Sequence, residues 1–93
     1  MRRYDDPVDV SQGVVAGLEG PAQFIWRDRI WQVREVVAHW VETGAWWRSA
    51  TAHDLLAERE TWRVVARRTS ATGVFDLRFD WADGSWRLIG CLD

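Results

Sequence analysis

Lysine and asparagine are absent from this chain, and cysteine occurs once. All twelve positive charges therefore belong to arginine. Because both missing residues have AT-rich codons, their joint absence indicates a GC-rich genome. The single cysteine, Cys91, excludes an intramolecular disulfide, and a buried, inert thiol is expected there. The formal charge is only −2 and neither sign forms a block, so bulk electrostatics support neither nucleic acid nor a membrane surface as the partner.

Long apolar runs are also missing. No stretch approaches the roughly 20 apolar residues of a membrane-spanning helix. Arg2 and Arg3 are followed by polar residues, unlike the apolar core of a signal peptide. We therefore expect a cytoplasmic protein with no membrane partner. Its 93 residues fit one domain, 1–93, in which residues 1–6 are expected to be flexible.

Tryptophan, in contrast, is abundant, with eight residues in the chain. Each indole can bury roughly 150–250 Å² of surface. A domain of this size folds with a thin margin of stability, so most of these indoles are expected in the core. The predicted core consists of Trp31, Trp62, Phe75, Leu77, Phe79, Trp86 and Leu88.

The C-terminal third has the clearest pattern of secondary structure. Residues 74–80 alternate strongly between apolar and charged side chains, with Phe75, Leu77 and Phe79 on one face, which is typical of a half-buried strand. The pair Asp83-Gly84 favours a tight turn, because glycine adopts positive φ without strain. Residues 62–92 are therefore predicted to form a three-stranded antiparallel meander, with turns near 70–73 and 82–84.

The N-terminal half is harder to assign. Residues 7–10 and 23–26 are predicted as short strands, and 16–22 as a loop because of its glycines and Pro21. Residues 30–43 fit either a bent or bulged strand, which their β-branched content favours, or an amphipathic helix. Thr51 suits the N-cap of a short helix near 52–59. The fold class is therefore mainly β: a small antiparallel barrel or strongly curved sheet of five or six strands with one short helix. An α+β fold is the alternative if 30–43 is helical.

Catalytic chemistry is difficult to assemble from these residues. The only histidines are His39, expected to be structural, and His53, expected to be solvated. Together with Cys91 they do not have the spacing of a zinc site. The paired carboxylates fall on expected solvent-facing positions, where nothing would raise a pKa for acid–base catalysis. We therefore expect a protein that is not an enzyme, with no catalytic residues, cofactor or metal.

Tryptophan and arginine follow each other closely in four segments, including Trp62-Arg63 and Trp86-Arg87, and two of the four supply the candidate binding residues. Arg27 and Arg29 stand between Trp26 and Trp31, and Arg48 follows the pair Trp46-Trp47. Adjacent side chains on a strand point to opposite faces, so the two indoles of the pair cannot both enter one core. The candidate binding residues are therefore Trp46, Trp47, Arg48, Arg27 and Arg29. Three interpretations remain open: guanidinium groups shielding indoles, contact with a protein, and stacking of unpaired bases.

The motifs Phe24-x-Trp26-Arg27-x-Arg29, His39-Trp40-Val41-Glu42 and Trp46-Trp47-Arg48 resemble a family of small uncharacterised actinobacterial proteins. The resemblance covers most of the chain. Members of this family are associated with gene clusters of translesion DNA polymerases. The resemblance thus implies an accessory role in damage-tolerant DNA synthesis, but it carries over no functional residues.

These observations favour a non-enzymatic module that binds another protein through an aromatic–arginine surface. The alternative is a small-barrel binder of single-stranded nucleic acid, which requires arginines gathered on one face. A small-molecule site or an enzyme in the mouth of a barrel is the third hypothesis.

Overall fold

A computed structural model describes residues 2–43 and 58–92 as a single antiparallel sheet of seven strands in the order β1-β7-β6-β5-β4-β3-β2. The described ranges contain no helix, and therefore none that is long and apolar enough to cross a membrane. The strands are β1 (Arg2–Pro7), β2 (Asp9–Val15), β3 (Leu18–Trp26), β4 (Arg29–Thr43), β5 (Glu58–Arg68), β6 (Ala71–Asp80) and β7 (Ser85–Leu92).

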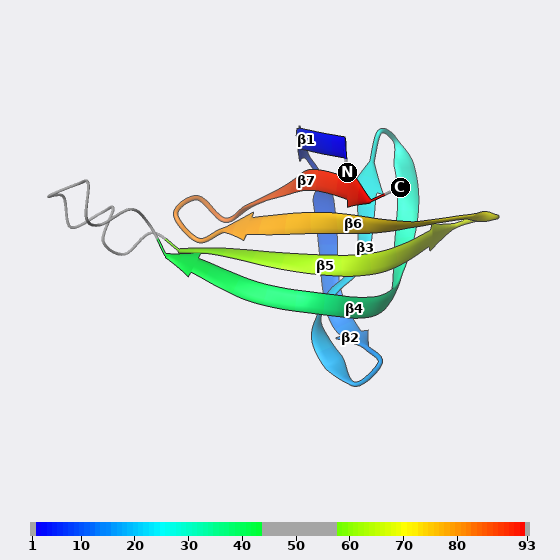
Figure 1. The fold of residues 1–93 in the computed structure, drawn as a ribbon, viewed down its shortest axis with the longest axis horizontal. Helices are drawn as coiled ribbons and strands as arrows, with labels where there is room; N and C mark the ends of the chain where they lie inside the picture. The colour runs from blue at the N-terminus through cyan, green and yellow to red at the C-terminus, as the bar shows by residue number, and fades with distance from the viewer. Residues whose placement is uncertain (1, 44–57, 93) are drawn as a thin grey trace, which may run out of the picture.

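The sheet folds over on itself. β1 and β2 lie at opposite ends of the strand order, yet only Val8 separates them in the chain. Val8 fixes this connection, because its N–H donates a hydrogen bond to the carbonyl of Trp86 in β7 over 3.2 Å. As Figure 1 shows, β4, β5 and β6 run side by side while β2 and β3 cross behind their middle. The core lies between these two parts of the sheet.

The prediction of a barrel or curved sheet of five or six strands with one helix is wrong. The sheet is open, because β1 and β2 at its ends do not pair with each other, and the N-terminal segment forms more strand than its sequence suggests. Residues 2–7, expected to be flexible, pair with β7 as β1. The predicted loop at 16–22 is mostly the hairpin of β2 and β3. Pro21 fits there because β3 pairs with β4 only from Gln23 onward, so the proline lies where β3 has a side without a partner strand.

The two helical expectations have different outcomes. Residues 29–43 form the strand β4, so the α+β alternative is wrong. The pairing of β4 with β5 shifts register between Val33 and Glu35 and again between Val36 and Ala38, which is the irregularity that so long a strand requires. These shifts turn Val37 outward, where it is 53% exposed. Of the predicted helix at 52–59, residues 52–57 lie outside the described residues and the last two begin β5.

The predicted C-terminal meander is confirmed. β5, β6 and β7 are consecutive antiparallel neighbours. The first turn contains Thr69 at a φ of 48°, and the second contains Gly84 at a φ of 69°. Gly84 donates its N–H to the carbonyl of Asp80 over 2.8 Å, which closes the second turn.

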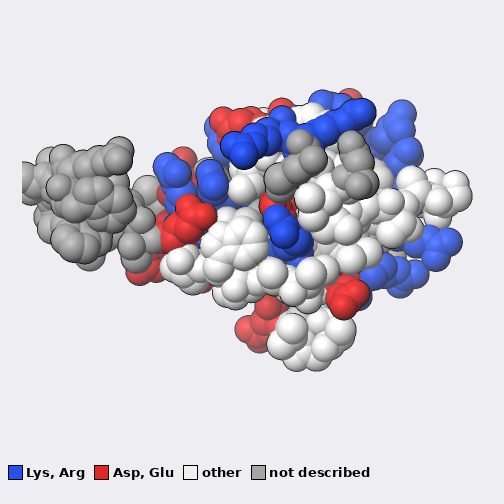
Figure 2. Space-filling model, viewed as in Figure 1, with Lys and Arg blue, Asp and Glu red and all other residues white. Residues whose placement is uncertain are grey.

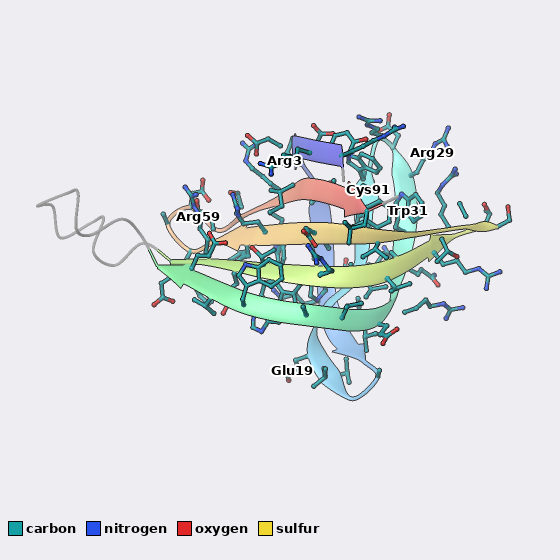
Figure 3. The ribbon with its side chains drawn as sticks, in the orientation of Figure 1. Arg3, Glu19, Arg29, Trp31, Arg59 and Cys91 are labelled. Atoms are coloured by element: carbon teal, nitrogen blue, oxygen red, sulfur yellow. The ribbon has the colours of Figure 1, made fainter. Side chains whose placement is uncertain are left out.

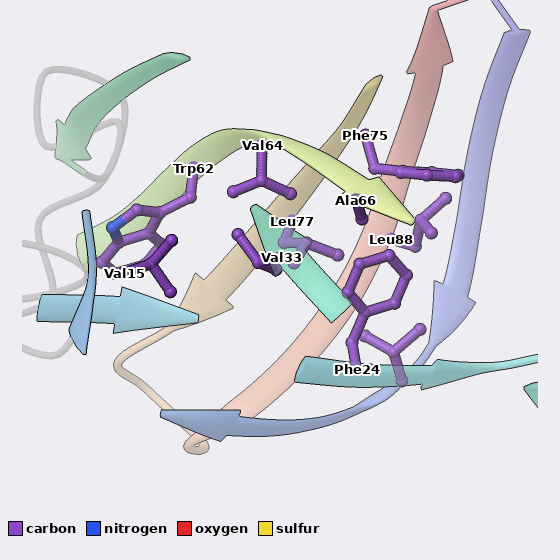
Figure 4. Close-up of a cluster of buried hydrophobic side chains, with 10 residues drawn as sticks. Val15, Phe24, Val33, Trp62, Val64, Ala66, Phe75, Leu77 and Leu88 are labelled. Carbon is purple, nitrogen blue, oxygen red and sulfur yellow. The ribbon is translucent and has the colours of Figure 1, made fainter. Parts of the chain in front are cut away.

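Aromatic rings dominate the core, which Figure 4 shows in close-up. The ring of Phe75 lies edge-on to Phe24, Trp26 and Trp31, with centroids 5.3, 5.8 and 4.7 Å away. Edge-to-face geometry brings the positive edge of one ring to the negative face of another. Four of the predicted core residues are buried, namely Trp62, Phe75, Leu77 and Leu88. The other three, Trp31, Phe79 and Trp86, are partly buried and pack against this cluster.

Candidate binding surfaces

The residues selected from the sequence have separate locations. Trp46, Trp47 and Arg48 lie outside the described residues. Arg27 packs within the domain, with its guanidinium carbon 4.5 Å from the ring centroid of Trp26 and its Nε 3.8 Å from the carboxylate of Asp6. Arg29 is exposed and projects away from the ribbon, as its label in Figure 3 shows. Both arginines are exposed at the β3–β4 turn, and their role in binding a partner stays a prediction.

Arginine shields indole at several places in the sheet. Besides Arg27 on Trp26, the guanidinium of Arg63 lies 5.7 Å from the ring centroid of Trp40, and that of Arg68 lies 5.7 Å from Trp31. A guanidinium on an aromatic face gains cation–π attraction and covers apolar area. The pair Arg27–Trp26 belongs to the tryptophan–arginine pattern of the sequence and fits its shielding interpretation, whereas the other two pairs join residues far apart in the sequence.

The outer face of β1, β7, β6 and β5 is strongly charged but balanced. Arg63 donates two hydrogen bonds to the buried carboxylate of Asp76, over 2.9 and 3.1 Å. These bonds, together with the negative charge of Asp76, raise the pKa of Arg63 above its usual value. Ion pairs also join Arg59 to Asp80 and Arg87 to Asp5. Figure 2 shows this face, with basic and acidic side chains next to each other over β1 and β7.

A hollow of about 590 Å³ opens on this outer face. Arg59, Arg78 and Asp80 line it from β5 and β6, and Arg3 and Asp5 line it from β1. Figure 3 labels Arg3 and Arg59 at two sides of this region. Because carboxylates alternate with guanidinium groups across it, the hollow presents no net charge of one sign to a ligand.

The inner face of the sheet exposes aromatic side chains beyond the β2–β3 hairpin. Val41, Glu60, Phe79 and Trp86 are successive cross-strand partners on β4, β5, β6 and β7. Trp81 follows directly after β6 and meets the ring of Phe79 edge-on, with centroids 5.0 Å apart. We call Val41, Phe79, Trp81 and Trp86 the aromatic surface.

Two members of the aromatic surface are open to solvent, Trp81 with 56% and Val41 with 49% of its area exposed. The hairpin covers the neighbouring Trp62 instead, because Gly20 lets β3 approach the indole closely. A Cβ at Gly20 would lie only 3.2 Å from Nε1 of Trp62. In Figure 1 the ends of β4, β5 and β6 nearest the β6–β7 turn extend past the point where β2 and β3 cross.

The position of Trp81 is fixed by the backbone. Its N–H donates to the carbonyl of Glu58 over 3.0 Å, which ties the start of the β6–β7 turn to the start of β5. The indole is therefore exposed on an anchored backbone rather than at the tip of the turn. Anchored aromatic side chains lose little conformational entropy on binding, which suits a contact residue.

The comparisons with known proteins concern the whole chain. A family model described as a domain of unknown function, DUF6504, matches residues 1–93. The chain belongs to this family. No curated protein and no solved structure matches it. The DUF6504 family description assigns no activity, so functional arguments rest on the surfaces of the domain itself.

Possible metal ligands are dispersed over the described part of this DUF6504 domain. Within residues 2–43 and 58–92, no three His, Cys, Asp or Glu side chains are grouped so that they could hold a metal ion. His39 stacks on Trp62 with ring centroids 4.4 Å apart, which agrees with the structural role expected for it. Cys91 is half-buried at the edge of the core.

Sequence reasoning missed the aromatic surface. Phe79 and Trp86 were assigned to the core, and neither Trp81 nor Val41 was selected as a contact residue. The available signal is that Trp81 stands between the end of an alternating strand and the turn Asp83-Gly84. At that position a large apolar side chain lies at the end of a sheet, where little of the fold is left to cover it.

Proposed function

We propose that this domain is a non-enzymatic module that binds another protein, and that the aromatic surface is a principal contact. The observation that carries the proposal is the exposed indole of Trp81, packed against Phe79 on the same face as the exposed Val41. Contiguous exposed apolar area is characteristic of interaction sites, and tryptophan is among the residues that most often dominate binding energy.

The partner is expected to present apolar side chains surrounded by basic ones. Glu58 and Glu60 stand on β5 beside the aromatic surface, and neither has an Arg or His within ion-pair distance among the described residues. Basic groups on the partner would complement these carboxylates. Such rim charges mainly guide association and specificity, while the central aromatic contacts supply most of the affinity.

Around the aromatic surface, the arrangement of arginines favours protein over nucleic acid as the partner. On the outer face, Arg59, Arg63 and Arg87 are each matched by an aspartate. A surface that binds the phosphate backbone of single-stranded nucleic acid instead needs unmatched positive charge along a groove, next to exposed rings for stacking. Here the backbone N–H of Trp81, whose indole is exposed, donates to the carbonyl of Glu58, an acidic residue without an ion-pair partner among the described residues.

We place this protein contact within a DNA damage-tolerance assembly. This part of the proposal is supported by the resemblance of Phe24-x-Trp26-Arg27-x-Arg29 and Trp46-Trp47-Arg48 to proteins associated with translesion polymerase genes. A binding module without catalytic groups suits an accessory role in such an assembly. The candidate contacts Trp46, Trp47 and Arg48, which lie outside the described residues, remain part of the prediction.

The test is affinity capture from the native cells after DNA damage, using three forms of the full chain. Wild type is compared with Trp81→Ala and with Leu18→Ala, a matched control because Leu18 is also 56% exposed but lies on the β2–β3 hairpin. We expect wild type and Leu18→Ala to enrich the same partner and Trp81→Ala to lose it while remaining folded. Equal capture by all three forms would show that the aromatic surface is not the contact. If wild type captured the same amount of partner from undamaged cells, the result would argue against the damage-tolerance role.

A further inference from the structure

A second, chemically different site lies at the end of the sheet where β5 turns into β6. An open hollow of about 450 Å³ is formed there by the outer part of β4 and the last residues of β5. Gln32 on β4 and Arg67 on β5 are direct cross-strand partners at this place. Figure 2 shows basic side chains gathered at this end of the molecule. The hollow is lined by Ile30, Gln32, Arg34, Arg67, Arg68 and Thr69.

Three of these lining residues, Arg34, Arg67 and Arg68, form what we call the arginine cluster. None of them has a carboxylate within 4.0 Å among the described residues. On the outer face, Arg59, Arg63 and Arg87 are each paired with an aspartate, and Arg3 and Arg78, which have no such pair in the described part of the chain, share their hollow with four aspartates. Placing three cations around one hollow without a counter-ion costs stability through mutual repulsion. An anion in the hollow would remove that cost.

Two members of the cluster are held in position by the fold. Arg67 donates its Nε–H to the carbonyl of Thr69 over 3.2 Å, which leaves its two terminal amino groups without a described partner. Arg68 lies over the indole of Trp31, and its Nε is buried without a hydrogen-bond partner in the described structure. The terminal donors of Arg67 are therefore oriented before any ligand arrives, which reduces the entropy lost on binding, and Arg68 adds positive charge at the edge of the hollow.

We propose that the arginine cluster binds one phosphate group, either as free phosphate or at the end of a small phosphorylated molecule. Guanidinium groups match phosphate oxygens through paired, charge-assisted hydrogen bonds. The hollow falls within the range of small-ligand sites, roughly 300–1,000 Å³. Because the chain carries a net charge of −2, its three clustered charges suit one compact anion rather than a long polyanion.

The experiment is a titration of isotope-labelled protein with inorganic phosphate, followed by the NMR signals of the Trp31 indole N–H and the Arg68 Nε–H. Sodium chloride at matched ionic strength serves as the reference, since general screening acts on all exposed charges. We expect saturable shifts of both signals with phosphate, at a Kd of about 1 mM or below. The absence of saturation with phosphate, or equal shifts with chloride, would overturn the proposal.

Matched variants test the residues themselves. Arg67→Gln and Arg34→Gln should each weaken phosphate binding at least about tenfold, because each removes charge-assisted donors. Arg3→Gln makes the same change of charge on β1, which contributes nothing to the hollow, and should leave the Kd within about twofold. Phosphate should also raise the melting temperature of wild type but not of Arg67→Gln. If Arg3→Gln weakened phosphate binding as much as Arg67→Gln does, the loss would reflect the overall charge of the protein, and the proposed site would be refuted.

A final comparison distinguishes the sources of phosphate. Short single-stranded oligonucleotides with and without a terminal phosphate are titrated in the same way. The proposal is supported if oligonucleotides bind only when they carry the terminal phosphate and if Arg67→Gln abolishes this binding. It is also supported if inorganic phosphate binds and neither oligonucleotide does. Binding that increases with oligonucleotide length and ignores the terminal phosphate would instead indicate a track for the nucleic-acid backbone, and the single-phosphate site would be wrong.

Discussion

Trp62 and Trp81 provide a direct test of how the inner face is divided between core and contact surface. Trp62 is 92% buried beneath the hairpin, beside the rings of His39 and Trp86 at centroid distances of 4.4 and 5.2 Å. Replacing it with alanine removes a large apolar side chain and leaves a cavity, which costs about 3–5 kcal/mol. For 93 residues the whole free energy of unfolding is of the order of 5–14 kcal/mol. Trp62→Ala therefore removes a large part of the stability.

The matched substitution Trp81→Ala should cost far less, because more than half of Trp81 is already exposed. Its edge-on contact with Phe79 accounts for at most about 1.5 kcal/mol. Urea denaturation followed by far-UV circular dichroism measures both variants without relying on the eight overlapping tryptophan fluorescence signals. In thermal melts, Trp62→Ala should lower Tm by roughly 12 °C or more. Similar losses for the two variants, or a loss below about 1 kcal/mol for Trp62→Ala, would refute this division of the inner face.

Three further predictions concern single contacts. Asp76→Asn should lower the urea midpoint more than Asp80→Asn, because the Asp76 side chain is 5% exposed and that of Asp80 is 28% exposed; the reverse order would contradict the role of burial. Ser85→Ala should raise the pKa of Asp83, which the Ser85 hydroxyl and N–H hold below its usual value. A carboxyl group whose pKa is lowered by folding stabilises the fold at pH values above its unfolded pKa, and this contribution is lost as the pH falls. Ser85→Ala should therefore lose less stability than wild type on acidification below about pH 4. Carboxyl NMR titration would measure the pKa, and thermal melts at acidic pH would measure the stability. Gly20→Ala should lower the free energy of unfolding by about 1–3 kcal/mol, because its Cβ would crowd the indole 3.2 Å away; an unchanged melting temperature would mean that β3 can move aside.

The parts of the fold that sequence predicted correctly depend on local signals. The meander of β5, β6 and β7 follows from the alternation at 74–80 and from the turn at Asp83-Gly84, both of which lie within a few residues of the structure they specify. The same local reasoning failed for residues 2–7. Their strand exists because Arg2 faces Cys91 and Pro7 faces Arg87, partners at the other end of the chain.

The candidate site could be predicted even less well. Which side chains of β4 face inward depends on two register shifts, which place Val36 and His39 opposite Val64 and Trp62 and turn Val37 outward. A strict two-residue period cannot show these shifts, because it would place Val37 on the same face as Val33. The exposure of Trp81 depends on how far the β2–β3 hairpin extends over the inner face, which is a property of packing rather than of sequence near Trp81.

The connection through Val8 has a consequence for the order in which the domain can fold during synthesis. β1 is synthesised before the other described strands but pairs with β7, whose last residue is Leu92. Until β7 is made, both edges of β1 are unpaired, and unpaired edges promote association between nascent chains. Pairing the two ends is also a contact of very long sequence separation, and such contacts slow folding. The charged arginines and aspartates of β1 therefore have a second role: they disfavour pairing of this edge with other chains before β7 is available.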